Sequence, residues 1–224
     1  MQVSKLSQLG FCQAAFKLSH ERKIVTARMA DGINYHNRLA SDIPLFMPND
    51  SQKVRAGAIF SAREIDVSDK SLMLTGRIDQ VDFCGFARQG NALNLSVLFD
   101  DKFPKNPVSF KMSDTHKIQL AAYATAFEND NKFKDVSKIF FASIRVWDKA
   151  KIVNTFDVNR RSLERWENIV PDLIDVGKRI VWNRQDAQPV YFCMDERKWC
   201  DVGARCAFCK YGDACNYRNA STKL

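Results

Sequence analysis

An aspartate and a lysine two positions apart, Asp100 and Lys102, have the residue types and spacing needed to handle a divalent cation and a water molecule. The surrounding residues predict a strand, in which side chains two apart share a face, so Asp101 between them points away. A carboxylate beside an ammonium group can hold Mg²⁺ or Mn²⁺ and orient a water whose pKa the cation lowers. The pair therefore predicts chemistry at a negatively charged group such as a phosphate.

A single carboxylate rarely holds such a cation, and Asp79 on the preceding predicted strand is the obvious second ligand. Strands that are adjacent in sequence commonly pair, so Asp79 and Asp100 can meet, and Gly76 permits a close backbone approach. His36 can complete the shell with a neutral imidazole, which favours Mn²⁺ over Mg²⁺. The alternative is that both aspartates are strand-end polar residues and that His36 is structural.

Gln119 and Tyr123 stand four residues apart and therefore share one face of the helix predicted after the strand that carries Lys102. That face can overlook the aspartates and the lysine. Taken alone, such a pair is more often a packing contact.

Cysteines near both ends of the chain predict a second, softer metal site. Cys206, Cys209 and Cys215 supply three thiolates, which select zinc or an iron–sulfur cluster. The fourth ligand is either Cys200, in a local knuckle typical of zinc, or Cys12, whose distance suits an iron–sulfur cluster. The spacing leaves both alternatives open.

The elements that must position these residues predict a mixed α/β domain. Helical periodicity predicts helices over 3–20, 21–40, 113–128 and 160–182, the last with a kink at Pro171. Strand-forming runs predict strands over 58–67, 72–83, 93–102, 137–147 and 152–158. Turn signals predict a loop over 41–53, and the last forty or so residues are predicted to be irregular.

The composition allows one compact domain with a real core, because the chain has 224 residues and is 46% hydrophobic. The net charge of +8 is equally consistent with a polyanionic partner such as nucleic acid and with an ordinary basic protein. The apolar runs are too short to span a membrane, and the first residues lack the apolar core of a signal peptide. We therefore expect a cytoplasmic protein, in which seven cysteines favour metal ligation over disulfides.

In this order along the chain, the motifs resemble the CRISPR-associated, RecB-like PD-(D/E)xK exonuclease family that carries a [4Fe–4S] cluster. The resemblance covers nearly the whole chain. The motifs are Cys12 with Phe16 and Leu18, Gly32 to His36, Gly76 to Asp79, Asp100 to Lys102, Gln119 to Tyr123, and Cys206-x2-Cys209-x5-Cys215. The chain departs from the family at Gln13-Ala14, at Asp100, where members often have Glu, and at Phe103-Pro104, where they have small or polar residues.

The resemblance implies a restriction-endonuclease-like α/β core, with a mixed sheet flanked by helices and an iron–sulfur cluster joining the N- and C-terminal segments. It implies a single nuclease domain over 1–224, with an N-terminal helical part over 1–40, a nuclease core over 55–185 and a cysteine-rich segment over 186–224. The implied site comprises His36, Asp79, Asp100 and the main-chain carbonyl of Asp101 as metal ligands, Lys102 acting on the water and the phosphate, Gln119 and Tyr123 supporting the site and the DNA, and Cys12, Cys206, Cys209 and Cys215 as cluster ligands.

The implied activity is Mg²⁺- or Mn²⁺-dependent hydrolysis of single-stranded DNA, as exonuclease or endonuclease. The implied setting is the processing of DNA ends in CRISPR spacer acquisition, beside an integrase complex, or a related pathway. The alternatives are a weak or inactive iron–sulfur DNA-binding scaffold, a viral, plasmid or repair nuclease of the same build, and a zinc-stabilised interaction module that uses Cys200.

Overall fold

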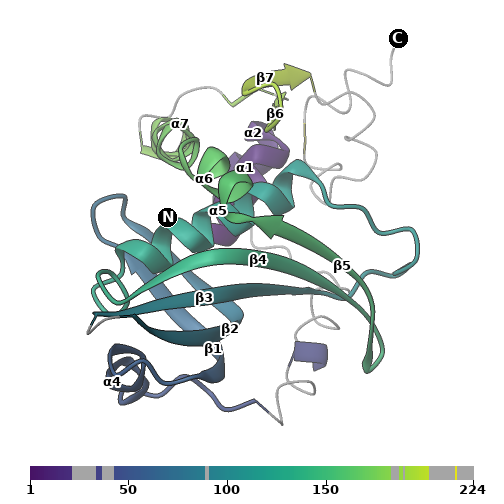
Figure 1. Ribbon diagram of the computed structural model, residues 1–224. Helices are drawn as coiled ribbons and strands as arrows, with labels where there is room; N and C mark the ends of the chain where they lie inside the picture. The colour runs from purple at the N-terminus through teal and green to yellow at the C-terminus, as the bar shows by residue number, and fades with distance from the viewer. Residues whose placement is uncertain are drawn as a thin grey trace.

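The computed structural model describes residues 1–21, 34–36, 43–88, 91–182, 187–188, 190–201 and 215. A five-stranded sheet in the order β1-β2-β3-β4-β5 forms its centre, and β6 and β7 form a separate two-stranded sheet (Figure 1). The predicted α/β fold with a mixed sheet flanked by helices is confirmed. The elements are α1 (Val3–Phe11), α2 (Gln13–Glu21), α4 (Asp50–Arg55), β1 (Phe60–Asp69), β2 (Leu74–Arg88), β3 (Asn91–Lys102), α5 (Asp114–Asn129), β4 (Ser137–Asp148), β5 (Lys151–Asn159), α6 (Arg160–Glu167), α7 (Val170–Trp182), β6 (Val190–Cys193) and β7 (Lys198–Asp201).

The sheet is mixed because its middle connection is a helical crossover. Strands β1, β2 and β3 pair antiparallel, as do β4 and β5, whereas β3 and β4 pair parallel. A parallel pair needs a long connection, and α5 supplies it. Figure 1 shows α1, α5, α6 and α7 above the sheet and α4 below it. The C-terminal end of β3 and the start of α5 consequently lie near each other.

Helix α5 is the buried centre of the helical layer. It is rich in alanine, the best helix former, and small side chains let it approach both the sheet and α1. His116 Nδ1 accepts a hydrogen bond of 3.0 Å from the Ser113 amide and so satisfies a polar group at the helix start. Its buried residues are Ile118, Leu120, Ala121, Ala122, Tyr123, Ala124, Ala126 and Phe127.

Several predicted elements differ from those observed. The helix predicted over 3–20 is two helices, because Cys12 between them is extended, with φ at −169°. The helix predicted over 160–182 also divides, and Pro171 lies in the first turn of α7, where its missing N–H costs no helical bond, so it does not kink a continuous helix. The predicted loop over 41–53 runs into α4.

The C-terminal segment is also more regular than predicted, since β6 and β7 pair antiparallel. The helix predicted over 21–40 lies largely outside the described residues, and Asn34–His36 are described as helical. In the part of the chain that is described, no helix is both long and apolar enough to cross a membrane.

Candidate functional site

Two neighbouring strands and one helix bring most of the predicted site residues together. Asp79 lies on β2, Asp100 and Lys102 lie on β3, and α5 carries Gln119 and Tyr123. The Asp101 amide donates a hydrogen bond of 2.7 Å to Asp79 Oδ2, which ties the two strands together at this point. The expected approach of the β2 and β3 carboxylates is therefore observed.

Asp100 and Lys102 form a close ion pair, as expected for side chains on one face of a strand. Lys102 Nζ lies 2.9 Å from Asp100 Oδ1 and 2.8 Å from Oδ2, and Asp100 is only 2% exposed. Gln119 bridges the group: its Oε1 accepts from Lys102 Nζ at 3.1 Å, while its Nε2 lies 3.4 Å from Asp100 Oδ1 and 3.3 Å from the Tyr123 hydroxyl. The helix face predicted to overlook the strand residues thus contacts them directly.

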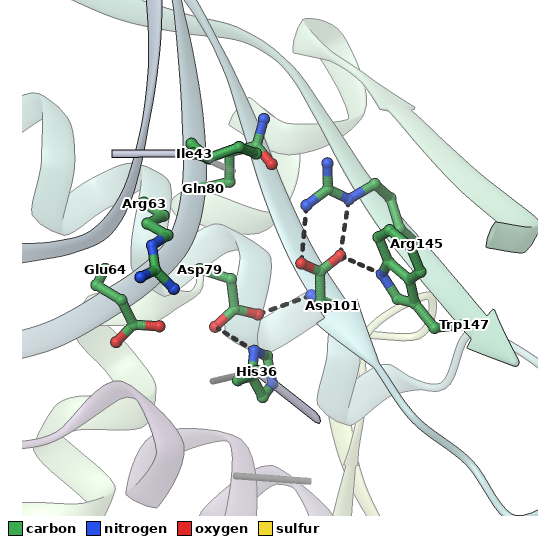
Figure 2. Close-up of a pocket in the computed structure, with 9 residues that line it drawn as sticks. All are labelled: His36, Ile43, Arg63, Glu64, Asp79, Gln80, Asp101, Arg145 and Trp147. Carbon is green, nitrogen blue, oxygen red and sulfur yellow. Dashed lines mark hydrogen bonds and ion pairs between the residues drawn. The ribbon is translucent and has the colours of Figure 1, made fainter. Parts of the chain in front are cut away.

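The Asp101 side chain points to the opposite face, also as predicted. Arg145 on β4 donates two hydrogen bonds of 2.7 Å to its carboxylate, and Trp147 Nε1 donates one of 2.8 Å (Figure 2). This bidentate, largely buried pair fixes β3 against β4. Arg145 thus offsets the charge of this carboxylate, which makes the Asp101 side chain a weaker candidate for a metal ligand than Asp79 or Glu64.

The structure adds a residue that the sequence analysis missed, Glu64 on β1. His36, Glu64 and Asp79 each offer a ligand atom, and the three atoms lie within 4.8 Å of one another. The three side chains line one cavity (Figure 2), whose volume is about 80 Å³. His36 Nδ1 lies 3.7 Å from Asp79 Oδ1. Among the described residues this is the one group of metal-ligating side chains with such spacing, and Asp100 is not a member.

Backbone conformation explains how Glu64 reaches this position. It has a positive φ of 52°, a region that non-glycine residues rarely adopt. The register of β1 and β2 pairs Arg63 with Gln80 and Ile65 with Ile78, which places Glu64 across from Asp79. The sequence contains only part of this signal: 58–67 and 72–83 are predicted as consecutive strands, which commonly pair, but neither the register nor the positive φ is predicted.

The electrostatics of the site favour a bound cation. Burial, followed by the nearby negative charge of Asp100, raises the pKa of Asp79 well above its usual range. Burial lowers the pKa of His36, which leaves its imidazole neutral and able to ligate a metal at neutral pH. Burial also raises the pKa of Tyr123, so its hydroxyl remains a hydrogen-bond donor. In the described part of the chain, Lys102 contacts Asp100 and Arg77 Nη1 lies 3.6 Å from Glu64. A divalent cation would offset the remaining negative charge of these carboxylates.

Gly76 allows the close approach that its position on β2 suggested. A Cβ at this residue would lie 2.8 Å from Tyr123 Cε1 and 2.8 Å from Val3 Cγ2, distances that real Cβ atoms essentially never show. Any side chain here would therefore force Tyr123, Val3 or the β2 backbone to shift.

Two of the predicted cluster cysteines lie together in a small buried cluster separate from the main core. Cys12, at the junction of α1 and α2, and Cys215 are both buried and belong to one small cluster, against which Tyr191 of β6 packs. Cys206 and Cys209 lie outside the described residues. Cys200 on β7 is partly buried and stands opposite Tyr191 in the hairpin. The first and last of the four cysteines implied by the family resemblance are thus neighbours.

Comparison with known proteins supports a family assignment. Residues 13–216 match the family model described as the PD-(D/E)XK nuclease superfamily. The chain is also similar to a solved structure titled "Crystal structure of SSO0001", with 12% sequence identity, a TM-score of 0.47, and coverage of 97% of this chain and 86% of that one. No curated protein sequence matches it. Because the family model spans nearly the entire chain, this protein belongs to the PD-(D/E)XK nuclease superfamily.

Proposed function

We propose that this protein is a metal-dependent deoxyribonuclease that hydrolyses phosphodiester bonds in single-stranded DNA or at single-stranded ends, as exonuclease or endonuclease. Membership of the superfamily implies metal-dependent nuclease activity. The observation that carries the assignment to this site is the buried ion pair of Asp100 and Lys102, held by Gln119 next to Asp79. The nuclease is proposed to be one domain over residues 1–224.

The donor set at the site fits a hard divalent cation, Mg²⁺ or Mn²⁺. Carboxylates of Asp79, Asp100 and Glu64 would supply oxygens, and the neutral imidazole of His36 would supply a nitrogen that favours Mn²⁺. Both Asp100 oxygens already contact Lys102 Nζ, at 2.9 and 2.8 Å, so a cation there would join an existing ion pair. Gln80 lines the cavity that Asp79, Glu64 and His36 surround, and its buried Oε1 accepts no hydrogen bond from the described residues. An unsatisfied oxygen acceptor in this position suits a cation.

When bound, the cation would lower the pKa of a water and offset charge on the scissile phosphate. Lys102 Nζ is held beside Asp100, so it can donate to a water or to a phosphate oxygen bound next to that carboxylate. It can therefore orient the attacking water or stabilise charge on the phosphate. Gln119 holds the lysine in place and can turn its amide toward the substrate. The Tyr123 hydroxyl, kept protonated, accepts a hydrogen bond from Gln119 Nε2 and can donate its own proton to a phosphate oxygen.

We further propose that Cys12, Cys206, Cys209 and Cys215 hold a [4Fe–4S] cluster that joins the N- and C-terminal segments. The juxtaposition of buried Cys12 and Cys215 supports this, because thiolates from both ends of the chain are needed. The cluster would cross-link the N- and C-terminal segments and would take no part in hydrolysis. Iron and acid-labile sulfide in anaerobically purified protein would support the cluster, whereas a colourless zinc protein would contradict it.

The resemblance in motif order supports a place in CRISPR spacer acquisition, with the protein trimming DNA ends beside an integrase complex in the cytoplasm. A viral, plasmid or repair setting uses the same chemistry. Reducing conditions in the cytoplasm keep thiolate ligands available.

Cleavage of end-labelled single-stranded DNA tests the proposed activity. We expect the wild type to cut in Mn²⁺ and not in EDTA, with 5′- and 3′-labelled strands revealing whether it starts from an end. Asp100→Asn should abolish cutting, while Asp175→Asn, on the exposed face of α7, should cut normally. DNA binding without cleavage in any divalent cation would favour the scaffold alternative.

A further inference from the structure

Three aromatic side chains form a row beside the proposed metal site. Tyr35 stacks on Phe103 with ring centroids 5.2 Å apart and planes 8° apart, and Phe103 lies over Trp147 at 6.3 Å and 19°. Each is partly exposed, and in the described chain none belongs to either hydrophobic cluster or packs against one. Their positions are therefore not explained by burial in the core.

These rings line a cleft of about 420 Å³. Two exposed lysines, Lys105 and Lys149, and one exposed aspartate, Asp148, stand at its border, and Pro104 and Pro107 restrict the backbone of the loop after β3. The cleft thus combines flat apolar surfaces with a small net positive charge. Its volume lies within the roughly 300–1,000 Å³ that is usual for sites of small ligands.

The cleft adjoins the proposed catalytic centre. Trp147 lines both this cleft and the cavity that holds Asp79, and His36 packs edge-on against Phe103 at 5.0 Å. Phe103 itself follows Lys102 directly in the chain. A strand whose phosphate reached the group of His36, Glu64 and Asp79 would therefore present a neighbouring base to these rings.

We propose that this cleft binds an unpaired base of a single DNA strand by stacking, with Lys105 and Lys149 contacting the adjacent phosphates. This inference rests on the proposed nuclease function and specifies its substrate. Aromatic side chains bind bases of any sequence because every base has a π-face, and basic residues follow the backbone. A base within a duplex is already stacked, so the cleft selects single-stranded DNA or an unpaired end.

A structural role for Phe103 is the competing explanation, because its contacts with Tyr35 and His36 also hold the His36 segment. Phe103→Leu separates the two roles, since leucine keeps an apolar side chain against these neighbours and removes the stacking surface. Binding rather than cleavage is the appropriate measurement, because a shifted His36 would slow cleavage for either reason.

The test compares binding of two fluorescent oligonucleotides in EDTA by anisotropy. One is oligo(dT) of about 12 nucleotides, and the other has the same length and charge but abasic residues. We expect the wild type to bind oligo(dT) about tenfold more tightly, as one stacked base contributes roughly 1–3 kcal/mol. Phe103→Leu should remove most of this preference by weakening oligo(dT) binding, with abasic binding unchanged.

Charge variants test the remainder of the cleft. The double variant Lys105→Ala with Lys149→Ala should weaken binding of both oligonucleotides. It should also reduce the slope of log K against log salt concentration by about 1.4, because each of two lost phosphate contacts contributes roughly 0.7. The matched double variant Lys70→Ala with Lys134→Ala, at exposed lysines outside the cleft, should bind as the wild type does.

Two results would contradict the proposal that the cleft binds a base. One is equal affinity of the wild type for both oligonucleotides, and the other is a preference for oligo(dT) that remains in Phe103→Leu. Failure of the nuclease proposal is distinguishable, since it leaves binding in EDTA intact. A protein that prefers oligo(dT) over the abasic strand but never cuts DNA would support the base-binding cleft and contradict the nuclease proposal. A protein that cuts DNA without this preference would support the nuclease proposal and contradict the cleft.

Discussion

Replacing Lys102 with methionine removes the only described cation that contacts the buried Asp100 carboxylate. Asp100 is 2% exposed, and both of its oxygens lie within 2.9 Å of Lys102 Nζ. Methionine has a similar length and no charge, so Lys102→Met tests the charge with little change in packing. Gln119 Nε2, at 3.4 Å, remains as a weak donor to the carboxylate.

Breaking a buried ion pair by removing one partner typically costs about 3–5 kcal/mol. The Lys102 side chain is 21% exposed and Gln119 remains, so we place the loss in EDTA at roughly 2–3 kcal/mol. For a chain of this size the loss corresponds to a fall in Tm of about 4–12 °C. If a divalent cation binds beside Asp100, it replaces the missing positive charge, so the loss should shrink by about half or more in saturating Mn²⁺.

Urea unfolding of wild type and Lys102→Met, in EDTA and in Mn²⁺, measures both quantities. Lys134→Met, at an exposed surface lysine, is the control and should stay within about 0.5 kcal/mol of wild type. An equal loss in EDTA and in Mn²⁺ would show that no cation binds at Asp100. A loss in EDTA below about 0.5 kcal/mol would refute the electrostatic argument itself.

Three further predictions concern neighbouring residues. Glu64→Gln should weaken Mn²⁺ binding, measured by calorimetry, at least about tenfold while leaving the free energy of unfolding in EDTA within about 1 kcal/mol; unchanged affinity would remove Glu64 from the metal site. Gly76→Ala should destabilise the protein by about 1–3 kcal/mol in urea unfolding and slow cleavage, because its Cβ would lie 2.8 Å from the Tyr123 ring; wild-type stability would contradict this. Burial raises the pKa of Glu167 to about 7 despite the nearby charge of Arg160, so the folded state binds the carboxyl proton more tightly than the unfolded state does. The wild type therefore loses free energy of unfolding as pH rises from about 4.5 to about 7, and Glu167→Gln should become up to about 3 kcal/mol more stable relative to it between pH 4.5 and 8. A stability difference that does not change with pH would contradict this.

The part of the site that rests on local periodicity could be predicted from the sequence. Asp100 and Lys102 share a face because strand side chains alternate, and Gln119 and Tyr123 share one because four residues make about one helical turn. Both periodicities depend only on the local backbone conformation, so they apply independently of the tertiary structure. The order of strands and helices followed from the same patterns.

Features that depend on distant partners or on unusual backbone conformations could not be predicted. Glu64 reaches Asp79 only through the β1–β2 register and a positive φ. Asp101 finds Arg145 across a parallel strand pair 44 residues away. The break at Cys12 interrupts a helical pattern that continues through Ala15, with no proline to mark it.

The most direct test of the central claim is the single-turnover rate of cleavage of labelled single-stranded DNA in Mn²⁺ by wild type and Asp79→Asn. Asp79 is the residue that links the β1, β2 and β3 contributions to the site. The account predicts cleavage that EDTA abolishes and a rate at least about a hundredfold lower in Asp79→Asn, as expected for loss of a group that holds the catalytic cation. Equal rates for the two proteins, or wild-type cleavage that continues in EDTA, would contradict it.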